Sequence, residues 1–168
     1  FEAHPANAVA VRRMFSSAAM VMVLHRKIAE KSIGWAGDSG RVEILYNPVK
    51  IGIFDPPTKR PANQPPTVLM MGEIGERKGA FDLAECIPEI LKLVPNAQFR
   101  FAGNGETDRL QALVDRLGVA DHVDIMGWTA GQDKIDAFQN ADVYCLPSYA
   151  ENLPVSVLEA MAARLPVV

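Results

Sequence analysis

Short apolar runs alternate with amphipathic segments through the second part of the chain, and this alternation restricts the possible folds more than any other feature. The runs expected to be strands are 67–71, 97–102, 122–126 and 142–146, and the closing residues 166–168 predict one more. The first run, TVLMM, is apolar on both faces, as a central parallel strand must be. Strands separated by helices and short connections predict a parallel sheet with right-handed crossovers.

The segments between these strands have helical spacing. Apolar residues line one face of the first, namely Leu83, Ile87, Ile90, Leu91 and Val94. Pro88 is expected to kink or split this helix, because proline lacks the N–H donor. The next helix lies within 106–118 and ends where Gly118 suits a C-cap, and others follow near 131–139 and from about 154. The sequence therefore predicts a Rossmann-like α/β fold with helices on both faces of the sheet.

The first part of the chain predicts two more strands, at 19–24 and 42–46, with a helix near 25–34. The stretch RRMFSSAAMVMVL (12–24) has a basic pair before an apolar run, as signal peptides do. Its apolar part, however, is about half of the ~20 residues that span a bilayer. We interpret it as a buried strand with its approach.

Residues 47–66 contain six prolines, so we expect a linker, without regular structure through 56–66. The chain begins with Phe1 and ends within an expected strand, and we expect it to be a fragment of a longer protein.

The composition excludes some functions. With 17 Lys and Arg against 20 Asp and Glu, the net charge is −3, which gives no positive field to attract nucleic acid. Cys86 and Cys145 lack the spacing of a metal or redox centre and are expected to be buried thiols in a reducing compartment. His25 and His122 are expected to have structural or surface roles.

Four loops follow the four main strands, and in a parallel α/β sheet such loops meet at the carboxyl edge, where ligands bind. They are GEIGERKG (72–79), GNGE (103–106), GWTAG (127–131) and PSYAENLP (147–154). In the first, Arg77 and Lys78 precede a helix N-terminus, which disfavours cations unless an anion lies between. A bound phosphate would explain them, and so would a solvated loop.

The second and third loops carry weaker signals. Gly103 and Asn104 begin a bare GxG, which a tight turn explains as well as a ligand does. Gly127 and Trp128 could line a nucleotide pocket, or Trp128 could be a hydrophobic plug. We retain all four as candidate nucleotide-binding residues.

The fourth loop leads into an apolar helix with two carboxylates near its start. Pro154 suits the first helical position, so Glu151 lies in the loop and Glu159 about one and a half turns inside. Helical side chains lean toward the N-terminus, so Glu159 can point to the edge that Glu151 occupies. A carboxylate on a buried helix needs a partner. Either a ligand hydroxyl or a Lys or Arg of the same domain would serve.

These motifs together are similar to a known family. PSYAENLPVSVLEAMA resembles the Glu-x7-Glu signature of the retaining, GT-B-fold glycosyltransferases of family four. GEIGERKG, FRFAGNGE, VDIMGW and ADVYCLPS occur in that family's order and spacing. The resemblance runs from about residue 42 to 168, and more loosely from 15. It implies that 67–168 is most of the nucleotide-sugar-binding C-terminal domain, and that 1–46 is the end of the N-terminal acceptor domain.

The resemblance also implies roles for single residues. Lys78 matches the lysine that contacts the donor diphosphate, and Glu151 matches the glutamate that faces the donor sugar near the reacting carbon. Glu159 matches the glutamate that accepts hydrogen bonds from the ribose hydroxyls. The backbone N–H groups around Asn152 and Leu153 match those that hold the distal phosphate.

Two positions depart from the family pattern. Glu73 stands where the family usually has an arginine, and Arg77 is the nearest cation that could substitute. Arg164 stands where the family usually has a glycine, at a position that could require positive φ.

The resemblance implies transfer of a sugar from a nucleoside-diphosphate sugar to an acceptor hydroxyl, with retention. The alternatives are a sugar-nucleotide epimerase of the same fold and a non-catalytic sugar-nucleotide-binding module, which Glu73 favours. No DxD motif occurs, so we expect no cofactor and no divalent cation for donor binding. We expect a cytoplasmic protein, peripheral membrane association being an open alternative, and no activity from these 168 residues alone. The acceptor, whether glycan, lipid or small molecule, cannot be read from the sequence.

Overall fold

The computed structural model describes residues 5–55 and 64–168. The chain divides into two compact units, Phe1–Pro48 and Val49–Val168, which are described separately. Of the expected linker, residues 56–63 lie outside the described residues. Its first part belongs to the second unit, because Phe54 is buried there with its ring centroid 5.2 Å from that of Phe138.

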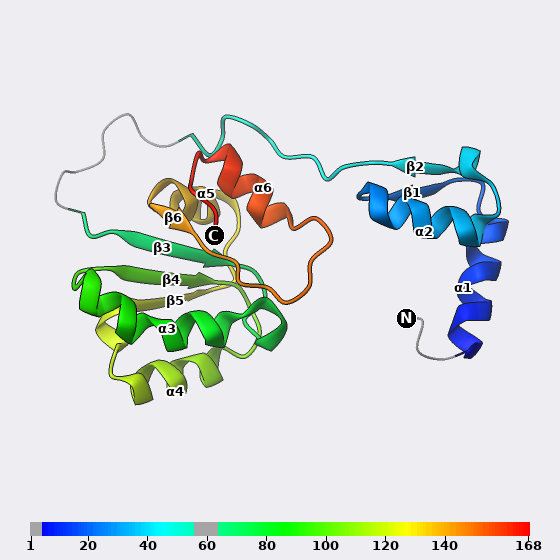
Figure 1. The fold of residues 1–168 in the computed structure, drawn as a ribbon. Helices are drawn as coiled ribbons and strands as arrows, with labels where there is room; N and C mark the ends of the chain where they lie inside the picture. The colour runs from blue at the N-terminus through cyan, green and yellow to red at the C-terminus, as the bar shows by residue number, and fades with distance from the viewer. Residues whose placement is uncertain (1–4, 56–63) are drawn as a thin grey trace. The chain divides into compact units, whose positions relative to one another are not determined.

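The first unit contains α1 (Pro5–Ser17), β1 (Val21–Val23), α2 (Arg26–Ala36) and β2 (Val42–Ile44), with a 3-10 turn at Ser39–Arg41 (Figure 1). β1 and β2 pair in parallel, and α2 is the crossover between them.

The interpretation of 12–24 as a buried strand with its approach is wrong for most of its length. Its first six residues end the helix α1, and the strand β1 is only three residues long, with Met22 64% exposed. A tertiary contact explains the helix, since the ring of Phe15 packs edge-on against Trp35 of α2 at 5.3 Å. The run of apolar letters therefore combines one helical face with a short strand.

The second unit is the expected parallel sheet. Its strands β3 (Thr67–Met71), β4 (Gln98–Ala102), β5 (Val123–Gly127) and β6 (Val143–Tyr144) lie in the order β5-β4-β3-β6 (Figure 1). The closing residues pair in parallel with β6 through a bridge between Tyr144 and Val167. The predicted α/β fold is thus confirmed.

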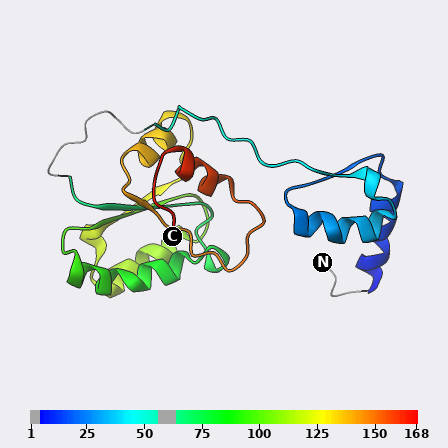
Figure 2. The same ribbon diagram turned by 45° about the horizontal axis from the view of Figure 1, so that its top comes forward.

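Helices cover both faces of this sheet, as Figure 2 shows from a second direction. They are α3 (Ala80–Leu93), α4 (Thr107–Leu117), α5 (Gly131–Gln139) and α6 (Val155–Ala162), and 3-10 turns occupy Glu76–Lys78 and Ala120–His122. α3 and α4 pack on the face that carries Phe99 and Phe101. α5 and α6 pack on the other face, around Leu69 and Tyr144. Two cores thus fix the sheet from both sides.

Three local expectations are corrected. Pro88 does not split its helix, because α3 runs through it with Ile87 fully buried against the sheet. Cys86 is exposed and Cys145 only half-buried, since the residue before Ile87 in a helix points about 100° away from it. Pro154 is the N-cap and α6 begins at Val155, one residue later than expected.

Arg164 has φ 61°, and among the described residues it is the only non-glycine with positive φ. The left-handed conformation costs a residue with a Cβ about 1–2 kcal/mol. An exposed ion pair with Asp55, at 3.2 Å, returns at most about 1 kcal/mol.

Replacing Arg164 with glycine is therefore expected to leave stability unchanged or to raise it by up to about 1 kcal/mol. The matched control is Arg116→Gly near the end of α4, which should cost about 1 kcal/mol in a helical backbone. Thermal melting of both variants tests this. Equal losses would show that the Asp55 ion pair outweighs the backbone strain.

Candidate functional site

A cavity of about 460 Å³ opens at the carboxyl edge of the sheet, and all four loops or the helices that follow them contribute to it. Its lining consists of 71–73, Lys78, 102–105, Trp128, Thr129, Lys134, 154–156 and Glu159. The topology of a parallel sheet thus brings residues from distant parts of the sequence into one site.

The first and second loops are joined by backbone hydrogen bonds that continue the pairing of β3 and β4. Ile74 N–H donates to the Asn104 carbonyl at 2.7 Å, and Glu106 N–H donates to the Ile74 carbonyl at 2.9 Å. Gly103 has φ 152°, and a Cβ there would lie 1.8 Å from the Gly72 carbonyl oxygen. The glycines of GNGE are therefore required by contact between two loops, and not only by a tight turn.

Lys78 lines the cavity from the first loop, and its side chain is 14% exposed. Its Nζ donates to Glu151 Oε1, and Ser148 Oγ donates to the same oxygen at 2.9 Å. Gly79 brings this turn against the fourth loop, because a Cβ there would lie 2.3 Å from the Pro147 carbonyl oxygen. Glu151 itself is not among the lining residues, so Lys78 stands between it and the cavity.

Arg77 does not line the cavity. Its guanidinium is 55% exposed and lies 3.2 Å from Glu73 and 3.7 Å from Glu151. Glu73, the departure from the family pattern, is a lining residue. The first loop therefore presents one cation and one carboxylate to the cavity.

Glu159 points from α6 into the cavity wall and is 8% exposed. Lys134 Nζ of α5 donates to Glu159 Oε1 at 2.5 Å, so the alternative of an ion pair within the domain is realised. Oε2 of Glu159 is buried without a hydrogen-bond partner among the described residues. The ion pair thus occupies only half of the carboxylate.

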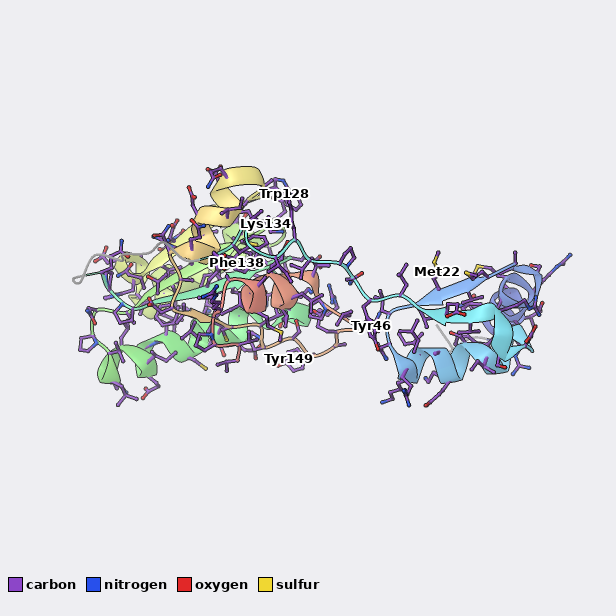
Figure 3. The ribbon with its side chains drawn as sticks, turned by 90° about the horizontal axis from the view of Figure 1, so that it is seen from above. Met22, Tyr46, Trp128, Lys134, Phe138 and Tyr149 are labelled. Atoms are coloured by element: carbon purple, nitrogen blue, oxygen red, sulfur yellow. The ribbon has the colours of Figure 1, made fainter. Side chains whose placement is uncertain are left out.

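Sequence reasoning missed Lys134, although a signal exists. It is the only lysine or arginine between Arg116 and Arg164, a stretch that holds an apolar helix with one inward carboxylate. In Figure 3, Trp128 and Lys134 are labelled side by side near α5, and both line the cavity.

The other candidates divide into two groups. Gly103, Asn104 and Trp128 line the cavity, and Trp128 is 74% exposed, which excludes the buried plug. Gly127, Asn152 and Leu153 are not lining residues. The first two residues of α6, Val155 and Ser156, reach the cavity instead, at a helix N-terminus that favours anions.

The histidines lie away from the cavity. His122 Nδ1 is 2.9 Å from the Ala97 carbonyl oxygen at the amino end of the sheet, and His25 begins α2 in the other unit. In the part of the chain that the structure describes, no three His, Cys, Asp or Glu side chains gather as metal ligands would. Within the same residues, no helix is long and apolar enough to cross a membrane.

Two opposing effects act on the Glu151 carboxyl. Burial raises its pKa, but the hydrogen bonds from Lys78 and Ser148 and the charges of Lys78 and Arg77 outweigh burial, so the pKa is lowered from the ordinary value of 4.5. A lowered pKa in the folded state means that Glu151 stabilises the fold above its unfolded pKa. This contribution is lost as the pH falls through the lowered folded value.

In Lys78→Met we expect the pKa of Glu151 to rise, because burial then loses its main opponent. Carbon-13 NMR titration of the side-chain carboxyls between pH 2 and 7, with Glu151→Gln to assign the signal, measures the change. An unaltered titration of Glu151 in the variant would show that Lys78 does not pair with it in solution.

Several known proteins resemble this chain. Over 104 residues it is 36% identical to the phosphatidyl-myo-inositol mannosyltransferase of Mycobacterium tuberculosis, a match that covers 61% of this chain and 27% of that protein. It is 27% identical over 126 residues to a phosphatidylinositol N-acetylglucosaminyltransferase of Arabidopsis thaliana, covering 74% and 28% of the two chains. The chain thus spans less than a third of the length of these relatives.

Solved structures share the fold. Anabaena HepE, determined with UDP and glucose, superposes with a TM-score of 0.78 at 19% identity, over 96% of this chain and 47% of that one. Staphylococcus aureus TarM superposes with a TM-score of 0.80 at 18% identity, over 98% and 32%.

The sequence model of one family, described as glycosyl transferases group 1, matches residues 54–168. The match begins at Phe54, the residue that anchors the start of the second unit in its core. It includes the whole sheet, all four loops and every residue that lines the cavity. This chain belongs to the glycosyl transferases group 1 family.

Proposed function

We propose that the protein of this chain is a retaining glycosyltransferase that moves a sugar from a nucleoside-diphosphate sugar to an acceptor hydroxyl. The observation that carries the proposal is that Lys78 and Glu159 line one cavity, at the sheet edge where α/β folds bind nucleotides. The UDP complex of the similarly folded HepE supports a nucleotide in this place.

The diphosphate would lie against Lys78 and the N-terminus of α6. The barrier to sugar transfer lies in separating an oxocarbenium-like sugar from a diphosphate, so positive charge fixed at the phosphates lowers it. Lys78 needs little reorganisation for this task, because Glu151 already holds its ammonium at the cavity wall. The N–H groups at the start of α6 add a second, dipolar source of positive potential.

The two glutamates would act as positioning groups. Glu151, behind Lys78, lies near the place expected for the bond between sugar and diphosphate, and Glu159 would accept from the ribose. In glycoside hydrolases, by contrast, two carboxyls flank the scissile bond as acid and base. In this chain a lysine salt bridge occupies each glutamate, which suits orientation better than proton transfer.

A second candidate is a module that binds a sugar nucleotide without turnover. One observation favours it, namely that Glu73 brings a negative charge to the cavity near Lys78. A carboxylate there opposes the build-up of charge on a leaving diphosphate. No comparable observation favours an epimerase.

The test uses the full-length protein with UDP-, GDP- and ADP-sugars, first with donor alone and then with acceptor. Both sequence relatives described above have an inositol phospholipid in their names, so vesicles containing phosphatidylinositol are the acceptor to try first. Sugar transfer with retained anomeric configuration supports the proposal. Donor binding without transfer or hydrolysis favours the binding module, and interconversion of the donor sugar with no acceptor identifies an epimerase.

A further inference from the structure

The Lys134–Glu159 pair is unlike the other ion pairs of the second unit. Both residues line the cavity, and the carboxylate end is much more enclosed, with side-chain exposures of 29% for Lys134 and 11% for Glu159. The pairs of Arg109 and Lys92 are half or more exposed on the surface and contribute little. A pair in a cavity wall, joined across two helices, fixes the side chain that it holds.

One oxygen of Glu159 is left out of this pairing. Oε1 accepts from Lys134, while Oε2 is buried and has no donor among the described residues. Leaving a buried carboxylate oxygen without a donor costs free energy, and a ligand hydroxyl removes that cost. The lysine determines which oxygen remains, because it reaches Glu159 from α5 and takes only Oε1.

We propose that Lys134 is a positioning residue, which holds Glu159 Oε1 so that Oε2 is left to accept from a ribose hydroxyl of the donor nucleotide. This inference rests on the proposed function, since it takes the cavity to be the nucleotide site. Lys134 acts through Glu159 and need not touch the nucleotide. Its effect therefore depends on the ribose hydroxyls and not on the charge of the phosphates.

That distinction makes the proposal testable by a ratio of affinities. The full-length protein is titrated with UDP, GDP and ADP, and the tightest of these is compared with its 2′-deoxy and 3′-deoxy forms. A hydrogen bond to a charged group corresponds to a loss of about tenfold or more when one hydroxyl is removed. In Lys134→Met, which keeps the length of the side chain without its charge, we expect most of this discrimination to disappear. Lys134→Arg should restore it.

The control is Lys92→Met, which removes an exposed lysine from the end of α3, outside the cavity lining. It should leave the ribose to deoxyribose ratio unchanged. Melting curves of all variants show whether each protein is folded.

The possible results separate the two proposals. If Lys134→Met weakens ribose and deoxyribose nucleotides by the same factor, Lys134 attracts phosphate or supports folding, and the inference is wrong while the nucleotide site stands. If the wild-type protein binds a nucleotide but ignores both hydroxyls, Glu159 does not read the ribose, and the inference again fails. If the wild-type protein binds none of the three nucleotides, the proposed function falls and the inference with it.

Discussion

Replacing Lys78 with methionine is expected to lower kcat/KM for the nucleotide sugar by at least about a hundredfold, because one preorganised charge at the leaving group has effects of this size. Lys78 is the one cation that the first loop presents to the cavity, since the Arg77 guanidinium is turned to Glu73 and Glu151. No other residue of this loop can replace it. Steady-state kinetics with the donor identified above measure the loss.

The fold should tolerate this change. Glu151 keeps its hydrogen bond from Ser148 and the nearby charge of Arg77, and its side chain is 23% exposed, so water can solvate it. Lys92→Met serves here too as the matched variant with one charge removed elsewhere, and it should keep full activity. A loss of less than about threefold in Lys78→Met would remove this lysine from the phosphate site.

Replacing Gly103 with alanine is expected to destabilise the second unit by at least about 3 kcal/mol, a large part of the stability of a typical domain. The added Cβ would lie 1.8 Å from the carbonyl oxygen of Gly72, and both atoms belong to backbone that is hydrogen-bonded in the sheet edge. Neither loop can move away without breaking the bonds between Ile74 and its partners.

Gly118→Ala is the control, because Gly118 also has positive φ, 69°, but no atom lies within 4 Å of an added Cβ. It should cost only about 1 kcal/mol, the usual cost of an alanine in the left-handed region. Urea denaturation followed by the fluorescence of Trp128 compares the two variants. Similar midpoints would mean that the two loops are not in contact in solution.

The regular parts of the second unit could be predicted from the sequence because their signals are local. TVLMM is apolar at positions that face both helical layers, and Gly118 ends α4 in the left-handed conformation expected of a C-cap. Arg164 likewise has the positive φ that its position was expected to require. Each of these depends on the residue itself and its close neighbours.

The errors arose where tertiary contacts decide. The helix α1 is held by a ring contact between Phe15 and Trp35, which lie far apart in the sequence. Pro88 remains inside α3 because packing against the sheet outweighs one missing hydrogen bond. Neither contact leaves a pattern within a short window of sequence.

The site was predicted in part for the same reason. The topology rule placed Lys78 and Glu159 at one edge, and both line the cavity. It could not show that Lys78 covers Glu151, or that Lys134 from a different helix takes half of Glu159. Such pairings depend on side-chain directions across two elements, which a single sequence does not specify.

The hydrogen bonds between the first two loops have a consequence for how this site can be altered. Ile74 pairs with both Asn104 and Glu106, so one loop is the template for the length of the other. Inserting a residue into either one would shift its backbone donors out of step with their acceptors. Transplanting a different nucleotide preference into this scaffold therefore requires exchanging 72–79 and 103–106 together, as a single cassette.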